Sequence, residues 1–334
     1  WVAHARQWRL MGQASALAIP GWYWAALLGP AFSPLPPSAD LGWLAWPLAL
    51  CCGPWLLRRL QAWLDDSALR HLHVLGFWLM AALLCRQAQW ATDQWATPGS
   101  GWQSLCWILV PASLVLLVSS PRAAARWPLR DFAQSYRVAG ALPLVAGLVL
   151  WLLHSLVSSG RAQPLPYVPV LNPLELGQCL VVLTLVMWVR ELPASIQAQL
   201  PEGRTRLAAL GGLAWLVITT MVLRACHHWA DVPWDASALF QSKLTQASLS
   251  VVWALLGVGL MIRGHRQVQR AVWVAGAGLL GVVVGKLFFL ELADHGGLYR
   301  IISFIVVGLL LLVVGYFAPV PPDQAAERAE SEVP

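Results

Sequence analysis

The stretch GAGLLGVVVGKLFFLELADHGGLYRIISF, residues 276–304, decides which kind of protein this chain can be. Gly276, Gly278 and Gly281 have the G-x-G-x-x-G spacing of a dinucleotide-binding loop. Such a loop follows a strand and opens a helix that faces solvent, and the apolar run around these glycines leaves no room for a strand. Nor does Lys286 belong to a phosphate-binding loop, since no serine or threonine follows it. The stretch therefore predicts a membrane-spanning helix and excludes nucleotide binding.

The same stretch has small residues along one face of the predicted helix. Ala277, Gly281 and Gly285 follow each other at intervals of four residues. Small residues at this interval let two membrane helices approach closely. We therefore expect a helix-packing face at these three positions.

The composition of the whole chain agrees with a membrane protein. Of its 334 residues, 58% are hydrophobic and 11% are charged, whereas about 25% of the residues in a soluble domain are charged. The apolar runs have the length that a helix needs to cross a bilayer, roughly 20 residues, and in lipid such runs must be helical. We predict an all-α, polytopic integral membrane helix bundle of about ten transmembrane helices, at residues 11–33, 41–57, 74–92, 102–120, 138–158, 173–191, 207–226, 245–262, 271–292 and 299–318.

The arginines indicate how these helices are oriented. They gather in alternate connections: Arg58, Arg59 and Arg70; Arg122, Arg126, Arg130 and Arg137; Arg190, Arg204 and Arg206; Arg263, Arg266 and Arg270. Positive charge collects on the cytoplasmic side of membrane proteins. We therefore expect both termini to be cytoplasmic, and the net charge of +6 does not indicate nucleic-acid binding.

The domain organisation is expected to be simple. Residues 1–319 are predicted to form one transmembrane domain, with halves 1–160 and 161–319 as an alternative division. The polar, acidic segment 320–334 is predicted to be a disordered cytoplasmic tail. The sequence begins with Trp1, and no signal peptide follows, so we expect a segment of a longer chain.

Ionisable residues gather at the predicted outer face of the C-terminal half. Ionisable groups in spans are costly, so they usually face the bundle interior or water and pair with each other. The candidate ligand-binding residues are Arg224, His227, His228, Lys286, Glu291, Asp294 and Arg300.

Three interpretations of this cluster are open. In the first, its basic and acidic members only neutralise each other. In the second, the cluster binds a polar or anionic ligand from outside. In the third, His227 or His228 is a general base beside Asp231 or Glu291, which makes these two histidines the candidate catalytic residues. The histidines lack a third ligand at a fixed spacing, and the six cysteines form no CxxC pair, so we expect no metal and no cofactor.

A second polar group lies in the outer connection YVPVLNPLEL, residues 167–176. Pro173 suits the first turn of a helix, and Asn172 is placed to cap it. Glu175 would then lie in the first turn, where the helix dipole favours a negative charge. We expect a capping role here, with a site role for Glu175 as the alternative.

Three strings, YVPVLNPLEL, QASLSVVWALLGVGLMIRGHR and GKLFFLELADHGGLYRIISFIVVGLLLLVVGYFAPVPP, resemble the bacterial predicted membrane proteins catalogued as domain of unknown function 2339. The resemblance covers about residues 165–322. It implies that Lys286, Glu291 and Arg300 form the recurring pattern of the family, with glutamate here in place of the more usual aspartate. It also implies a multi-pass protein of the bacterial inner membrane, and it implies no reaction.

The sequence therefore predicts a transport- or binding-type membrane protein with a periplasm-facing site for a small polar, anionic or lipid-linked ligand. One alternative is an envelope enzyme that acts on a lipid-linked or glycan substrate with a histidine base. Another is a structural subunit of a larger envelope complex. The expected partners are the lipid bilayer, other envelope membrane proteins and lipid-linked glycans. The 21 tryptophans are expected to form an aromatic belt at the membrane interfaces.

Overall fold

The fold is known from a computed structural model that describes residues 8–16, 18, 20–22, 24, 25, 35–286, 308 and 312. All regular elements in this part of the chain are helices, and it contains no strand. The all-α prediction is therefore confirmed. The predicted tenth span, 299–318, lies outside these residues apart from two positions, and the predicted tail 320–334 lies wholly outside them.

Eight of the predicted spans coincide with long helices. These are α4 (Gly42–Leu60), α5 (Asp66–Asp93), α6 (Gly101–Ser119), α9 (Leu142–Val157), α10 (Pro173–Arg190), α12 (Gly203–Trp229), α14 (Lys243–Arg266) and α15 (Arg270–Lys286). The shorter helical elements are α2 (Arg9–Ala16), α7 (Pro121–Ala124), α8 (Leu129–Gln134), η1 (Ser135–Gly140), α11 (Ala194–Gln197) and α13 (Ala236–Gln241).

Fewer helices meet the requirements of a membrane span than the sequence predicts. In the described residues, five are long and apolar enough, namely α5, α6, α10, α12 and α14. A sixth is possible if Leu129–Gly140 and Leu142–Val157, which are bent by 40° at their junction, form one broken span. The described chain is thus a helical membrane protein with five or six candidate spans, and the total of ten stays a prediction.

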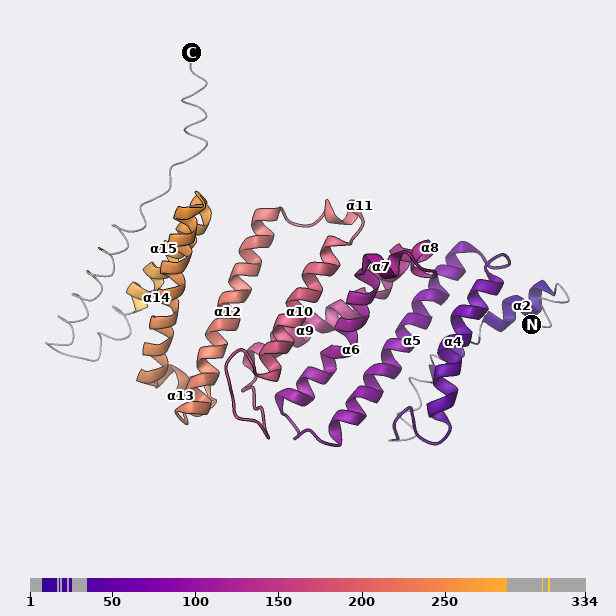
Figure 1. The fold of residues 1–334 in the computed structure, drawn as a ribbon, viewed down its shortest axis with the longest axis horizontal. Coiled ribbons are helices and arrows are strands. Elements are labelled where there is room, and N and C mark those ends of the chain that lie inside the picture. The colour runs from indigo at the N-terminus through magenta and orange to yellow at the C-terminus, as the bar shows by residue number, and fades with distance from the viewer. Residues whose placement is uncertain are drawn as a thin grey trace, which may run out of the picture. The chain divides into compact units, whose positions relative to one another are not determined.

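The chain forms two compact units, Trp1–Met221 and Val222–Pro334, so the division lies within α12. In the first unit α4, α5, α6 and α10 are neighbours that run alternately up and down (Figure 1). Helix α9 packs against both α6 and α10. The predicted domain limits at residues 319 and 320 stay predictions.

Local sequence explains where two of these helices begin. The Ser100 side chain accepts a hydrogen bond from the Gln103 amide at the start of α6 (3.4 Å). The Asn172 side chain accepts one from the Leu174 amide at the start of α10 (2.8 Å). Such caps satisfy amides that have no partner within the helix. The predicted capping role of Asn172 is confirmed.

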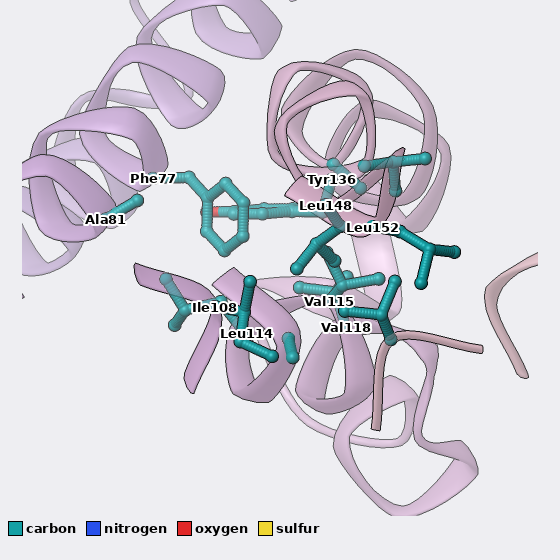
Figure 2. Close-up of a cluster of buried hydrophobic side chains, with 13 residues drawn as sticks. Phe77, Ala81, Ile108, Leu114, Val115, Val118, Tyr136, Leu148 and Leu152 are labelled. Atoms are coloured by element: carbon teal, nitrogen blue, oxygen red, sulfur yellow. The ribbon is translucent and has the colours of Figure 1, made fainter. Parts of the chain in front are cut away.

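The core of the first unit lies where α5, α6, η1, α9 and α10 meet. Phe77, Ile108 and Leu148 are almost fully buried there, and Figure 2 shows them converging with Tyr136 of η1. Burying apolar surface against other helices brings dense packing, which adds many small dispersion contacts. This core fixes the neighbouring helices of the first unit in place.

The segment η1 is a π-helical turn, in which each amide bonds to the carbonyl five residues before it. The Ala141 amide accordingly donates to the Tyr136 carbonyl (2.8 Å). Two indole N–H groups bond to carbonyls of this turn: Trp188 donates to Arg137 (2.7 Å) and Trp78 donates to Gly140 (3.0 Å). Neighbouring helices therefore supply donors to this irregular backbone, as buried polar groups require.

The basic connections of the first unit lie at one common end of its helices. The connections α4–α5, α6–α8 and α10–α12 are all at this end (Figure 1). There the Arg137 guanidinium donates to the carbonyl of Val118, at the end of α6 (3.0 Å), and forms an ion pair with Glu191, just after α10 (3.3 Å). The alternation of arginines therefore corresponds to one basic end, whose cytoplasmic location stays a prediction.

The second unit contains the antiparallel pair α14 and α15. A Cβ atom placed on Gly276 would lie 2.6 Å from the Gly257 carbonyl oxygen, so these two backbones approach closely. Ala277 packs beside the small core of this pair. By contrast, nothing described lies within 4 Å of a Cβ at Gly281 or Gly285. The contact with α14 therefore uses Gly276 and Ala277, while a helix against Gly281 and Gly285 stays a prediction.

Candidate functional site

Four of the seven predicted ligand-binding residues lie in the described part of the second unit. They are Arg224, His227, His228 and Lys286. The other three, Glu291, Asp294 and Arg300, lie outside the described residues.

Lys286 ends the described part of α15 and reaches across to α14. Its ammonium nitrogen donates to the Gln246 carbonyl oxygen (2.8 Å) and to the Ser250 hydroxyl (2.7 Å). The Ser250 hydroxyl in turn donates to the same carbonyl (2.9 Å). Both of these acceptors are neutral oxygens of α14, and the two contacts fix the position of the ammonium group.

This arrangement places Lys286 against the first two turns of α14. The antiparallel pairing of two consecutive helices brings the end of one beside the start of the other. Lys286 of the predicted ninth span thus meets Gln246 and Ser250, two of the polar residues near the start of the predicted eighth span.

His227 lies in the last turn of α12 and is held by the loop that follows. Its Nδ1 atom lies 2.7 Å from the Val232 carbonyl oxygen. A carbonyl can only accept, so Nδ1 carries the proton and Nε2 is left as an acceptor in the neutral ring. The ring also lies 4.6 Å from His228 and 5.7 Å from Trp234, measured between centroids.

This geometry bears on the general-base interpretation. The Nδ1 atom of His227 is oriented by the Val232 backbone carbonyl rather than by the carboxylate of Asp231, and Glu291 lies outside the described residues. Asp231 adopts a left-handed backbone conformation in the loop, with φ of 53°. In the described residues no three side chains among His, Cys, Asp and Glu are grouped so that they could hold a metal ion.

Arg224 is fully buried, one helical turn before His227. Buried charges are normally paired and hydrogen-bonded. As a ligand contact, Arg224 would therefore act from the interior of the protein, and its role in binding stays a prediction.

The loop between α12 and α13 ends in a helix cap. The Asp235 carboxylate accepts bonds from the amides of Ser237 (3.0 Å) and Ala238 (3.2 Å) and from the Ser237 hydroxyl, which start α13. The hydroxyl bond, followed by the backbone bonds, lowers the pKa of Asp235 below its ordinary value. Asp235 is thus a structural anchor of this connection.

Glu175 of the first unit is more deeply placed than a simple first-turn charge. It is 3% exposed, and its two oxygens accept bonds from the Tyr167 hydroxyl (2.5 Å) and the Val170 amide (2.5 Å). Tyr167 is itself buried. Glu175 therefore fastens the connection before α10 onto that helix, in addition to the cap made by Asn172.

Sequence reasoning missed a buried histidine in the first unit. His73 of α5 is 2% exposed, and its Nδ1 atom lies 2.9 Å from the Tyr136 hydroxyl. Phe132 stacks on its ring at 4.3 Å, and Trp127 meets it edge-on at 5.8 Å. The sequence shows only that a histidine lies one residue before a predicted span. Its aromatic partners could not be inferred, because they lie more than 50 positions away along the chain.

Comparison with known proteins gives one match. The family model described as "Predicted membrane protein (DUF2339)" matches residues 1–321. The match extends through the first half of the chain, beyond the 165–322 expected from the sequence strings. Neither the curated proteins nor the solved structures gave a match.

Proposed function

Because the chain belongs to the DUF2339 family of predicted membrane proteins, we propose that it is a multi-pass protein of the bacterial inner membrane that binds an anionic ligand at Lys286. The family description names a membrane protein and no activity. The choice among transport, binding and catalysis therefore depends on the site.

The observation that carries the proposal is the position of the Lys286 ammonium group. A charged group within a predicted span is costly and usually serves a function. Two contacts with neutral oxygens of Gln246 and Ser250 orient this group between α14 and α15. An anchored ammonium group is a suitable point of attraction for a phosphate or carboxylate, because little further ordering is required on binding.

The predicted topology assigns a direction of access. The start of α14 and the end of α15 would face the periplasm, so the ligand would arrive from that side. His227, whose ring is oriented by Val232, lies in the last turn of α12 at the same predicted face. In this proposal the His227 side chain exchanges a proton with the bound anion and so helps to set its protonation state.

The test measures whether small anions stabilise the full-length chain, reconstituted in nanodiscs of zwitterionic lipid. Inorganic phosphate and succinate represent the two anionic groups. We expect at least one of them to raise the unfolding temperature of the wild type, and Lys286→Met to weaken that effect at least about ten-fold in apparent affinity.

Two serines of α14 provide a matched comparison. Ser250→Ala removes one anchor of the ammonium group and should weaken the effect of the anion. Ser248→Ala, two positions away on the same helix, should leave it unchanged. The proposal is wrong if neither anion stabilises the wild type, or if Lys286→Met responds as the wild type does.

A further inference from the structure

The first unit contains a cavity that is separate from the Lys286 site. Its volume is about 240 Å³, and it lies among α4, α5, the end of α6 and the turn η1. Its wall is apolar except at His73 and Tyr136. The space is slightly smaller than a typical small-ligand pocket, which starts at about 300 Å³, so it suits a single chain or ring.

Glycines help to explain why the helices leave this space. Gly53 of α4 and Gly76 of α5 both line the cavity. A Cβ atom on Gly53 would meet only a ring atom of Trp22, at an ordinary distance of 3.8 Å. The chain could therefore accommodate a methyl group at this position, and it has none.

The aromatic group beside the cavity, His73 with Trp127, has an unmet hydrogen-bonding requirement. In the described part of the chain, His73 Nε2 is buried with no partner, and so is the indole nitrogen of Trp127. Leaving such a group unsatisfied costs about 1–3 kcal/mol, and buried polar atoms in native structures usually have a protein, water or ligand partner. An apolar cavity with so few polar atoms is poorly suited to water alone, which needs two to four polar partners.

The turn η1 supports a binding role for this end. It places the Tyr136 hydroxyl on His73 Nδ1, and this contact fixes the orientation of the imidazole ring. Phe132 holds the other side of the ring by stacking. Single π-helical turns occur frequently at functional sites.

Positive charge lies just outside the aromatic group around His73. The guanidinium carbon of Arg58 lies 5.5 Å from the ring centre of Trp127. Arg58 is exposed and directly follows Leu57, which lines the cavity. Arginines at a membrane face attract anionic headgroups.

From these observations we infer that the cavity binds the acyl chain of a single-chain amphiphile with an anionic, oxygen-bearing headgroup. Part of the acyl chain occupies the apolar space between α4 and α5, which has room for roughly eight methylene groups at about 30 Å³ each. A headgroup oxygen bonds with His73, and the charge lies toward Arg58 at the basic end of the unit. A fatty acid and a monoacyl phospholipid share this chemistry.

The experiment labels the full-length protein in detergent with palmitate that carries a photoreactive diazirine in its chain. Cross-linked peptides are mapped by mass spectrometry, and we expect them to contain residues 49–57 and 72–80 of the cavity wall. Unlabelled palmitate or lysophosphatidylglycerol should compete, and the more effective one identifies the source of the headgroup. The neutral hexadecanol should compete about ten-fold less well.

Three variants make the result specific. Gly53→Leu fills the cavity and should reduce labelling there about ten-fold. His73→Phe keeps the stacked ring but removes its nitrogens, and should reduce labelling several-fold. His71→Phe is the matched control, because His71 is exposed on the same helix and bonds to the Ser67 carbonyl, and it should label as the wild type does.

The inference is overturned if Gly53→Leu, shown to be folded by gel filtration, is labelled as strongly as the wild type. It is also overturned if labels spread over the outer surface of the helices without enrichment at the cavity. Equal competition by hexadecanol and palmitate would refute the role of His73 and Arg58 in holding a headgroup. If His73→Phe does not fold, Gly53→Leu still decides the result.

Discussion

The contact between α14 and α15 allows a prediction in which two similar substitutions have opposite effects. Gly276→Ala introduces a methyl group 2.6 Å from the Gly257 carbonyl oxygen and 2.9 Å from the Met261 amide nitrogen. These are backbone atoms of α14, which cannot move aside as the end of a flexible side chain can. Gly278→Ala, two residues further along α15, meets nothing within 4 Å in the described structure.

The magnitude follows from the geometry. Ordinary contact begins near 3.4 Å, so the two backbones must separate by roughly 0.8 Å to admit the methyl group at Gly276. Overpacking of this kind costs about 1–3 kcal/mol. Alanine is favoured over glycine in a helix interior by about 1 kcal/mol, and both variants gain this term. Gly278→Ala should therefore be neutral or slightly stabilising, and Gly276→Ala should be less stable than it by about 1–3 kcal/mol.

The assay is SDS-induced unfolding of the full-length chain in mixed micelles, with the two variants compared under identical conditions. Taking the difference between them removes the helix-propensity term. Equal stability of the two variants would show that α14 and α15 do not meet through Gly276, and so would refute the described packing. A result in which Gly281→Ala is the most destabilising change would instead support the face predicted from the sequence.

Three further predictions concern polar anchors. Folding lowers the pKa of Asp235, chiefly through the Ser237 hydroxyl. The contribution of Asp235 to the stability of α13 is therefore present above its ordinary pKa of 3.8 and is lost as the pH falls through the lowered pKa. Hydrogen exchange of the α13 amides should show this loss in the wild type but not in Asp235→Asn, whose side chain caps the helix without titrating. In Glu175→Gln only one side-chain oxygen remains to accept from the Tyr167 hydroxyl and the Val170 amide, and it carries no charge. This variant should destabilise the protein by about 1.5–3 kcal/mol in the same SDS assay. A loss of stability below a few tenths of a kcal/mol would contradict the anchoring role. Asn172→Ala removes the cap of α10 and the bond that the Asn172 amide nitrogen donates to the Gly160 carbonyl (2.7 Å), so it should cost at least about 1 kcal/mol in the same SDS assay. Asn172→Asp keeps the capping acceptor but places a buried carboxylate oxygen against that carbonyl, so it should also destabilise the protein; an aspartate variant as stable as the wild type would contradict the role of the Gly160 bond.

Much of the fold could be predicted because helix formation in a membrane is a local matter. Every amide in lipid must be satisfied within its own helix, so apolar length alone located eight of the long helices. Local chemistry also located the start of α10, since Asn172 and Pro173 act on adjacent backbone groups. The same reasoning rejected nucleotide binding at Gly276, and α15 is indeed an uninterrupted helix there.

Only the tertiary structure decided which face of each helix meets a neighbour. Helix α15 has small residues on more than one face, so its sequence does not determine which face contacts α14. In the structure the face with Gly276 packs against Gly257 of α14. The α5–η1 cluster is equally non-local, because His73 and Tyr136 are 63 positions apart and meet through a π-helical turn. In lipid the inner and outer faces of a helix can be similarly apolar, so the sequence of one helix carries little information about its partner, whereas close packing between helices determines it.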